Sequence, residues 1–389
     1  MSKKNQTPET SIDETVNVNA KQPKKKKKKG GGFLGRLIRR FFLLLFTIVI
    51  LVVAALVLVL NLIFNGPSPA AQEVLTMSLI EASATKWVPA LFIGEERVAE
   101  IQASDGTELT EEVTDTSKVV IQKNNALSST NDEWAKYPDG IRIESYSGDT
   151  YNAHIMIIRD PSQVYMGTST EKYSTSIPGK RITEVMESST DVIAAINAGA
   201  FFDDGTASST VGSYPLGLVM SNGNCVWTRG KQPGLEGFAG FNEDDILVVS
   251  KTNLTQAQAE EKGIRDGCCF GPALIINEEI NMEAYNTNSG FNPRTAIGQR
   301  ADGAVIFVCI DGRQAGSIGG TYADIINIMV EYGAVNACNM DGGSSSVMMY
   351  RDTTGRYGTA GETVMINNYS LLQSQPRRMP NYWLVRSSN

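Results

Sequence analysis

The sequence predicts an α+β domain with a mixed sheet, several hairpins and one βαβ unit, preceded by a single transmembrane helix. Three observations support this fold class. Residues 41–60 form an unbroken apolar run. Asn-Gly and Asp-Gly pairs at 222–223 and 302–303 separate strand-like segments, which is the pattern of tight hairpins. Between 304 and 340, a strand pattern, a helix pattern and a second strand pattern follow one another.

The apolar run Phe41–Leu60 contains Thr47 as its only polar residue, and apolar character continues to Phe64. About 20 such residues match the thickness of the hydrocarbon core of a bilayer. The run is longer than the apolar region of a cleaved signal peptide. We therefore predict a transmembrane helix over residues 41–64.

The first 40 residues are strongly basic, with 12 Lys or Arg against 3 Asp or Glu and six consecutive lysines at 24–29. The positive-inside rule makes residues 1–40 a disordered cytoplasmic tail, suited to contact anionic lipid headgroups. The protein is then a single-pass protein of the cell membrane, with its main body outside the cell. That remainder has 23 basic and 39 acidic residues, a net charge of −16, so no nucleic-acid partner is expected.

Residues 65–138 are predicted to be a stalk or spacer. Their first part has helical composition after Pro67 and Pro69, and an acidic, polar segment around 104–118 follows. From residue 139 the residue pattern is that of a globular domain. We therefore expect one domain over 139–389.

Within this domain the predicted elements alternate between strands, hairpins and short helices. A strand ends before Asp160-Pro161, a short helix covers about 181–189, and a buried strand follows at 191–197. Three hairpins are expected at 216–228, 237–250 and 294–310.

The βαβ unit follows the third hairpin's first strand. The segment 304–310 is continuously apolar, as expected for a strand buried on both faces. Thr321 with Asp324 resembles a capping box for a helix over 322–332, and the second strand covers 334–340. The crossover makes the two strands parallel. Asp311 and Asp341 therefore emerge at the same sheet edge, where ligands bind in open α/β sheets.

Two facing carboxylates have several possible meanings. They form the minimal set for glycosidic cleavage, one as acid and one as nucleophile or base. They also suit a divalent cation, Ca²⁺ or Mg²⁺, through oxygen ligands. The ordinary alternative is a pair of Asp-Gly turns after strands.

The stretch NMDGGSSS at 339–346 raises two further alternatives, a serine nucleophile and a phosphate cradle. It lacks the second glycine of a nucleophile elbow, and the chain has no GxxxxGK[ST] loop. Ser344 and Ser345 are therefore expected to donate hydroxyl hydrogen bonds or to form a simple turn.

Other strand ends add candidate ligands. NAGAFFDDG leaves a buried strand and offers the Asn197 amide and an aromatic ring for a sugar face, although a turn with packed phenylalanines is the ordinary explanation. Arg294 and Arg377 offer guanidinium groups, which suit a phosphodiester.

The numbers of histidine and cysteine residues limit the possible mechanisms. His154 is the only histidine, so the chain has no HExxH motif, and a Ser-His-Asp triad would need His154 as its base. The five cysteines show no CxxC spacing.

Several motifs occur together in a recognisable order: NAGAFF, LGLVMSNGN, GPALIINEE, RTAIG, the DGR loop and NACNMDGGSSS. In this order, between Ile143 and Val385, the chain resembles the phosphodiester glycosidase family. The resemblance implies hydrolysis of a sugar-1-phosphodiester to free sugar and a phosphomonoester. Ala198 and Ser344 stand where the family has glycines.

The predicted site combines this resemblance with the residue patterns. Asp341 and Asp311 are the predicted catalytic residues. The predicted substrate-binding residues are His154, Asn197, Gly199, Phe202, Arg294, Thr295, Gly342, Gly343, Ser344, Ser345 and Arg377.

The leading hypothesis is a membrane-anchored extracellular glycosidase whose partners are the membrane and a sugar-phosphate or polysaccharide substrate. One alternative is a non-catalytic envelope glycan-binding or scaffold protein. Another is a metal-dependent phosphodiesterase that cleaves the P–O bond. The glycosidase hypothesis requires no cofactor, whereas the metal-dependent alternative requires a divalent cation.

Overall fold

The structure is a computed structural model that describes residues 33–80, 85–104, 113–118, 133–174, 176–202, 211–230, 236–369 and 375–387. The chain divides into two compact units, Met1–Leu58 and Val59–Asn389. The predicted basic tail lies outside the described residues up to residue 32.

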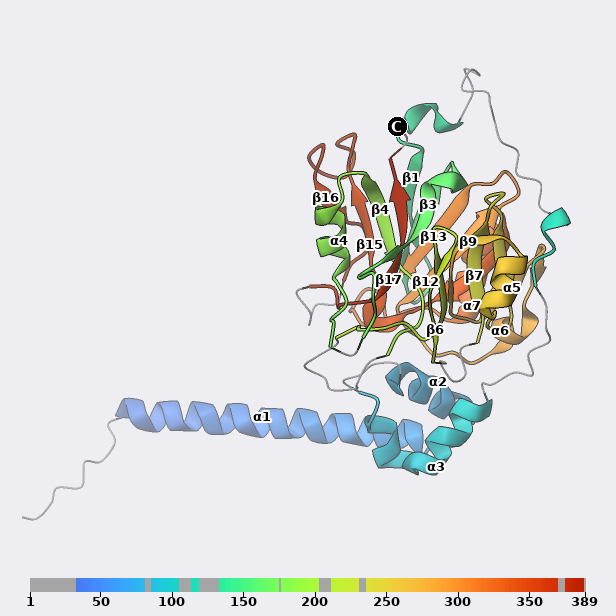
Figure 1. Cartoon of the computed structure of the whole chain (residues 1–389). Helices are drawn as coiled ribbons and strands as arrows, with labels where there is room; N and C mark the ends of the chain where they lie inside the picture. The colour runs from blue at the N-terminus through green and yellow to red at the C-terminus, as the bar shows by residue number, and fades with distance from the viewer. Residues whose placement is uncertain are drawn as a thin grey trace, which may run out of the picture. The chain divides into compact units, whose positions relative to one another are not determined.

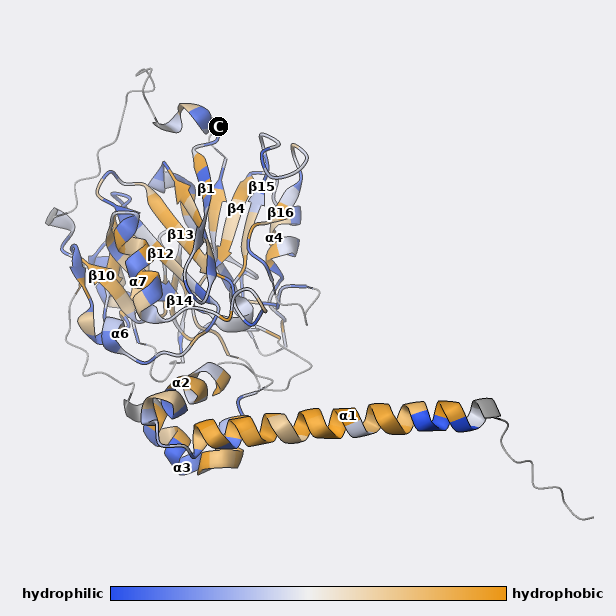
Figure 2. Cartoon of the chain, turned by 180° about the vertical axis from the view of Figure 1, so that it is seen from behind, coloured by the Kyte–Doolittle hydropathy of each residue, from blue (hydrophilic) through white to orange (hydrophobic). Residues whose placement is uncertain are grey.

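The first described element is a long apolar helix, α1 (Phe33–Phe64). Its segment Gly35–Phe64 is long and apolar enough to cross a membrane, and Figure 2 shows apolar residues along most of it. An N-terminal helix of this kind is compatible with a membrane anchor or a signal sequence.

In the described part of the predicted spacer there are two α-helices, α2 (Pro69–Ile80) and α3 (Val88–Ser104), of which the second was not predicted. Described parts of the spacer contact the body. The backbone N–H of Phe291 donates to Ser78 Oγ (2.9 Å), and that of Thr114 donates to the Val249 carbonyl (2.9 Å).

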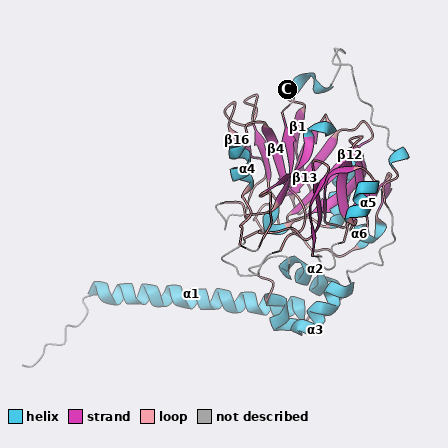
Figure 3. Cartoon of the chain, in the orientation of Figure 1, coloured by secondary structure: helices cyan, strands magenta, loops and turns pink. Residues whose placement is uncertain are grey.

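The described strands of the body form three antiparallel sheets (Figures 1 and 3). The seven-stranded sheet has the order β1 (Ile141–Ser147), β2 (Asn152–Ile158), β13 (Val305–Ile310), β12 (Arg294–Arg300), β14 (Ala334–Met340), β10 (Ala273–Ile276), β11 (Glu279–Ile280). The second sheet has the order β16 (Thr363–Met365), β15 (Met348–Arg351), β4 (Val192–Asn197), β17 (Asn381–Arg386), β3 (Val164–Thr168). The third has the order β6 (Asn224–Arg229), β5 (Gly217–Ser221), β9 (Ile264–Cys269), β7 (Phe238–Asn242), β8 (Leu247–Ser250).

The main core lies between the seven-stranded sheet and the two five-stranded sheets. Phe307 of β13, Trp383 of β17 and Phe241 of β7 meet there, each fully buried. The opposite face of the seven-stranded sheet packs on α7 (Tyr322–Glu331) and α6 (Met282–Asn286). The helices α4 (Ile182–Ser188) and α5 (Gln256–Glu261) cover the second and third sheets.

The predicted α+β class and its hairpins are confirmed. The strands on either side of Asn222-Gly223 pair, and both turn residues have positive φ (50° and 73°), as the tight hairpin turn requires. The hairpin at Asp302-Gly303 joins β12 to β13. Thr321 and Asp324 form the predicted capping box of α7.

The βαβ unit differs from the prediction in one respect. β13 and β14 run in the same direction, but β12 lies between them and pairs antiparallel with both. The reason is that the hairpin partner of β13 takes the neighbouring position before α7 crosses over. Every described strand pair is consequently antiparallel, and the parallel relation holds only across β12.

A loop between β15 and β16 is organised by one carboxylate. Asp352 is fully buried, and its two oxygens accept hydrogen bonds from the backbone N–H groups of Thr354, Arg356, Tyr357 and Gly358 at 2.6–3.1 Å. Burial alone raises the pKa of this carboxyl, but the four donors outweigh burial and lower it to about 2.

Candidate active site

The two predicted catalytic aspartates lie at one edge of the seven-stranded sheet. Asp311 follows the last residue of β13, and Asp341 follows the last residue of β14. Because β12 separates these strands, their backbones are roughly 10 Å apart. The two turns therefore lie at the same sheet edge, as predicted from the sequence. They are farther apart than turns on neighbouring strands would be.

Asp311 is held in a buried network with the only histidine. Its side chain is 1% exposed, and Oδ2 lies 3.1 Å from Nε2 of His154 on β2. Asn368 donates its backbone N–H to Oδ1 (2.9 Å) and its side-chain amide to Oδ2 (2.7 Å). Both carboxylate oxygens are therefore engaged by protein donors. The His154 side chain is 12% exposed, and its Nε2 is the ring nitrogen that faces Asp311.

Asp341 is positioned by its backbone. Its N–H donates to the Ala198 carbonyl (3.0 Å), and its carbonyl accepts from the Asn197 side-chain amide. The Asn197 oxygen accepts from the Thr295 hydroxyl (2.9 Å) and from the Val347 N–H (3.1 Å). These contacts join the ends of β4 and β14 to the starts of β12 and β15. Asn197 and Thr295 are both fully buried, so the structure gives them the geometry of a structural junction beneath the Asp341 turn.

The serine turn lies beside an arginine. Gly343 has φ 61°, a conformation that glycine adopts without strain, and it opens the short 3₁₀ turn Gly343–Ser345. Nη1 of Arg377 lies 3.2 Å from Ser344 Oγ and 3.5 Å from Ser345 Oγ. The Arg377 guanidinium also lies 4.7 Å from the ring centre of Phe201. The predicted hydroxyl donors and one predicted phosphate ligand are thus brought together.

Tyr369 links the serine turn to Arg377 through its hydroxyl group. Its hydroxyl donates to the Ser344 carbonyl at 2.6 Å and accepts from the Arg377 N–H at 3.3 Å. Burial raises the pKa of the Tyr369 hydroxyl, against the lowering effects of the Arg377 N–H and the nearby guanidinium charges. The hydroxyl therefore stays protonated at neutral pH, which its donation to the carbonyl requires.

Arg294 takes a different position from Arg377. It is 2% exposed, and its guanidinium donates to the carbonyls of Ser289, Gly290 and Gly320 at 2.6–3.2 Å. The same group stacks 4.4 Å from the ring centre of Tyr322. These contacts join the loop before β12 to the start of α7, which is a structural task.

The predicted glycines serve close approaches between backbones. A Cβ on Gly342 would lie 2.7 Å from the Pro293 oxygen, and one on Gly199 would lie 2.9 Å from the Cys269 oxygen. Both are distances that real Cβ atoms do not show, so the glycines let the turns pack against the body itself.

Phe202 begins a row of aromatic rings at the surface. It is 39% exposed and stacks on Tyr214, with ring centres 4.9 Å apart and planes 3° from parallel. Tyr214 in turn lies 5.4 Å from Trp227. Phe202 follows in the chain directly after Phe201, whose ring contacts the Arg377 guanidinium.

Comparison with known proteins decides the family. The family model for phosphodiester glycosidases matches residues 190–386, which is half of the chain and includes both aspartate turns. The chain belongs to the phosphodiester glycosidase family. The resemblance seen in the sequence motifs is thereby confirmed, and family membership supports a glycosidase-type hydrolase function.

Individual relatives are distant. The SPbeta prophage-derived uncharacterized protein YomE of Bacillus subtilis (strain 168) is 26% identical over 216 residues, 54% of this chain and 29% of YomE. The chain therefore spans less than a third of that relative's length. Among solved structures, the catalytic domain of zebrafish N-acetylglucosamine-1-phosphodiester alpha-N-acetylglucosaminidase is 19% identical, with a TM-score of 0.49 over 72% of this chain and 89% of that one.

Sequence reasoning missed three residues of this phosphodiester glycosidase that organise the site. Asn368 binds Asp311, Asn367 donates to the Ser346 carbonyl (3.2 Å), and Asn381 accepts from the Gly199 N–H (2.9 Å). The adjacent asparagines follow the strand-like segment TVMI, and polar residues at a strand end had been the signal for Asp311 and Asp341. Applied at residue 367, the same criterion would have found two of the three.

The described residues offer neither a metal centre nor a reactive thiol at this site. Among the described residues, no group of three or more His, Cys, Asp or Glu side chains could hold a metal ion. All five cysteines are free thiols, so Cys268 and Cys269 are not paired with each other. Burial raises the pKa of the Cys269 thiol to about 12, which keeps it protonated and unreactive.

Proposed function

We propose that this phosphodiester glycosidase is a membrane-anchored extracellular enzyme that hydrolyses a sugar-1-phosphodiester to free sugar and a phosphomonoester. Cell-envelope or exported polysaccharide would supply the substrate. The observation that carries this proposal is the Asp341 turn beside the Arg377–Ser344 pair, at the same sheet edge as the His154–Asp311 pair.

Arg377 is the proposed phosphate ligand. A planar guanidinium matches the geometry of phosphate oxygens, and two serine hydroxyls at 3.2 and 3.5 Å lie on the same side of it. Arg294 is assigned to holding the loop before β12 and contributes to substrate binding through the position of that loop. Phe202 offers an exposed ring on which the apolar face of a sugar can stack.

Asp341 is the proposed carboxylate at the sugar carbon. The C1–O bond to phosphate breaks, the phosphomonoester leaves with the bonding electrons, and the oxygen of a water molecule joins C1. A negative carboxylate stabilises the oxocarbenium-like charge that develops at C1. Since a phosphomonoester is a good leaving group, strong protonation of the leaving oxygen is unnecessary.

Asp311 is proposed to act through His154. Its oxygens are occupied by Asn368 and His154, and its side chain is 1% exposed. A carboxylate in this position fixes the ring orientation, so that the neutral imidazole can accept the proton of the attacking water at Nδ1, and it stabilises the positive charge that the ring then carries. Both predicted catalytic aspartates thus keep a part in the reaction, in different ways.

The test is hydrolysis of a panel of sugar-1-phosphodiesters by the full chain in detergent. Asp341→Asn should lower kcat/KM at least 100-fold, which is about 2.7 kcal/mol of transition-state stabilisation. Asp244→Asn, at an exposed turn residue, is the matched control and should keep wild-type activity. Full activity of Asp341→Asn, or no release of sugar by the wild type, would overturn the proposal.

Isotopically labelled water separates this mechanism from metal-dependent P–O cleavage. Label in the released sugar indicates C–O cleavage, whereas label in the phosphate indicates P–O cleavage. Glycan binding without any turnover would instead favour the non-catalytic alternative.

A further inference from the structure

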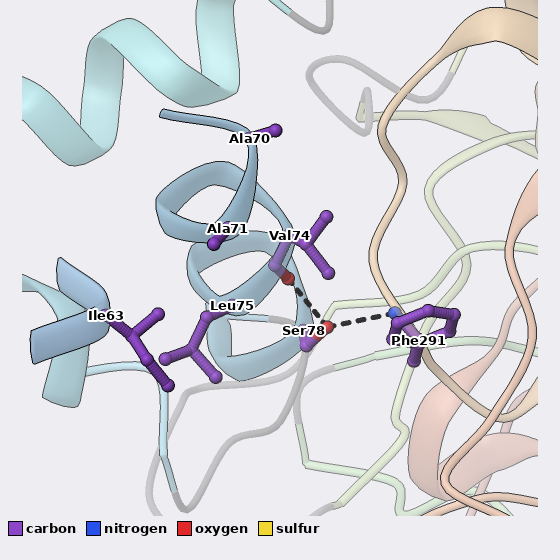
Figure 4. Close-up of a pocket in the computed structure, with 7 residues that line it drawn as sticks. All are labelled: Ile63, Ala70, Ala71, Val74, Leu75, Ser78 and Phe291. Atoms are coloured by element: carbon purple, nitrogen blue, oxygen red, sulfur yellow. Dashed lines mark hydrogen bonds between the residues drawn. The ribbon is translucent and has the colours of Figure 1, made fainter. Parts of the chain in front are cut away.

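An apolar pocket lies where the last turn of α1 and helix α2 meet the body. Its volume is about 390 Å³, and it is lined by Ile63, Ala71, Val74, Leu75, Ser78 and Phe291, together with Ala70 (Figure 4). All of these residues belong to the compact unit Val59–Asn389.

The pocket offers a ligand almost no polar group. Its one polar side chain is Ser78, whose hydroxyl donates to the Val74 carbonyl (2.7 Å) and accepts from the Phe291 N–H (2.9 Å), as the dashed lines in Figure 4 show. With these two bonds made, the remaining lining is hydrocarbon. The pocket is therefore suited to a hydrocarbon chain and not to a sugar or a phosphate.

The chain places this pocket at the end of the apolar helix. Ile63 is the penultimate residue of α1, the helix long enough to cross a membrane. Phe64 stacks on Phe92 of α3 with ring centres 5.2 Å apart, which ties α3 to the same point. If α1 spans the membrane, the pocket lies at its outer boundary.

Two exposed apolar side chains, one just before α3 and one in its first turn, support a lipid environment. Trp87 is 59% exposed and Leu91 is 70% exposed. Among the described residues that follow α1 in the chain, no other large apolar side chain is more exposed. Trp87 lies in the turn that precedes α3, and Leu91 lies in the first turn of α3. Exposed Trp and Leu side chains close together in the chain are typical of a segment that lies in the membrane interface.

The same helix α2 is connected to the candidate active site. Ser78 holds the N–H of Phe291, and a Cβ on Gly290 would lie 2.7 Å from the Ser78 nitrogen, so the two segments pack closely. Two residues further on, the Pro293 carbonyl accepts the N–H of Gly343 at 2.8 Å. Since two residues span at most about 7 Å, the pocket and the Asp341 turn are separated by one short piece of backbone.

We propose that this pocket binds the hydrocarbon chain of a membrane lipid, and that the substrate is a sugar-1-phosphodiester whose second ester is a long-chain lipid alcohol. This inference rests on the proposed function, because the same site would cleave the sugar–phosphate bond. The sugar and phosphate would lie at Asp341 and Arg377 while the hydrocarbon chain occupies the pocket that α2 and Phe291 line.

The test compares short-chain and long-chain substrates with the full chain in lipid nanodiscs. The methyl and octyl esters of one sugar-1-phosphate are both monomeric in water at low concentration. Burying two or more methylene groups in the pocket should raise kcat/KM of the wild type for the octyl ester at least tenfold over the methyl ester. Ala71→Trp, at an exposed lining residue of α2, should fill the pocket and remove that preference while keeping methyl-ester turnover.

Ala257→Trp is the matched control, because Ala257 is exposed on α5 and lines no part of this pocket. It should keep the chain-length preference of the wild type. Equal kcat/KM for the two esters in the wild type, or a preference that survives in Ala71→Trp, would overturn the lipid inference and leave the proposed function standing. If the wild type hydrolyses neither ester, the proposed function itself fails.

A second measurement does not depend on catalysis. Tryptophan fluorescence of the full chain in nanodiscs with brominated lipids should be partly quenched, and Trp87→Phe should remove the quenched component. Quenching that persists unchanged in Trp87→Phe, or no quenching in the wild type, would contradict the assignment of this surface to the membrane interface.

Discussion

Replacement of Asn197 by alanine tests whether the predicted substrate ligand is a structural junction. The side chain is fully buried and joins three partners: the Asp341 carbonyl, the Val347 N–H and the Thr295 hydroxyl. A buried polar group left without a partner costs about 1–3 kcal/mol. The Thr295 hydroxyl can turn to the neighbouring Cys309 thiol, so two groups carry most of the loss. We expect Asn197→Ala to lower the free energy of unfolding by about 3–4 kcal/mol.

The assay is urea unfolding of the detergent-solubilised full chain, followed by the fluorescence of its tryptophans, of which Trp383 is fully buried. The midpoint should fall with an unchanged slope, and the melting temperature should fall by roughly 5 °C for a body of this size. Thr295→Val removes only the hydroxyl that donates to Asn197, so it should cost about 1 kcal/mol.

A loss below 1 kcal/mol for Asn197→Ala would refute the junction. A raised KM with unchanged stability would show instead that the amide meets the substrate, as the sequence pattern had predicted. The structural account requires the stability loss and a fall in activity together, because the Asp341 turn loses its anchor.

Three further predictions concern single side chains. Asp352→Asn should lower the free energy of unfolding at pH 7 by about 2 kcal/mol. Because the folded pKa of about 2 lies below the unfolded value of about 3.9, this contribution is complete above pH 4 and disappears as pH falls toward 2. The urea midpoints of the two proteins, measured between pH 2 and 7, should therefore converge at the acid end. Arg377→Lys should raise KM for a phosphodiester at least tenfold. The Arg378 guanidinium binds Glu184, so Arg378→Lys should leave KM unchanged, and equal effects of the two variants would argue against a phosphate role for Arg377. Phe202→Ala should raise KM several-fold with little change in kcat or in unfolding free energy, since the ring is 39% exposed, and a stability loss above 2 kcal/mol would make it a core residue.

Local chemistry made the fold largely predictable from sequence. The hairpins at Asn222-Gly223 and Asp302-Gly303 depend on residues that tolerate positive φ, and the cap of α7 depends on two residues three positions apart. Such signals lie within a few residues of one another, so the sequence displays them directly. The insertion of β12 between β13 and β14 was not predicted, because strand order depends on pairings between distant segments.

In the candidate site, too, local features were predictable from the sequence and long-range contacts were not. The carboxylates, glycines and serines were found because they follow strands. Their roles were not predicted, because the partners of a side chain depend on how the chain folds around it. Arg294 and Arg377 look alike in sequence, yet one is buried among backbone carbonyls and the other faces the serine hydroxyls. Asn368 meets Asp311 across 57 residues.

The sequence alone determined the apolar N-terminal helix, the α+β class, the family and the two acidic turns at strand ends, since each depends on composition, short-range geometry or a motif. The tertiary structure alone decided that Asp311 is buried against His154, that Asn197 ties three strands together, and that an apolar pocket lies close to the Asp341 turn. These features arise from long-range packing, in which the burial of one group is set by segments that have no sequence relation to it.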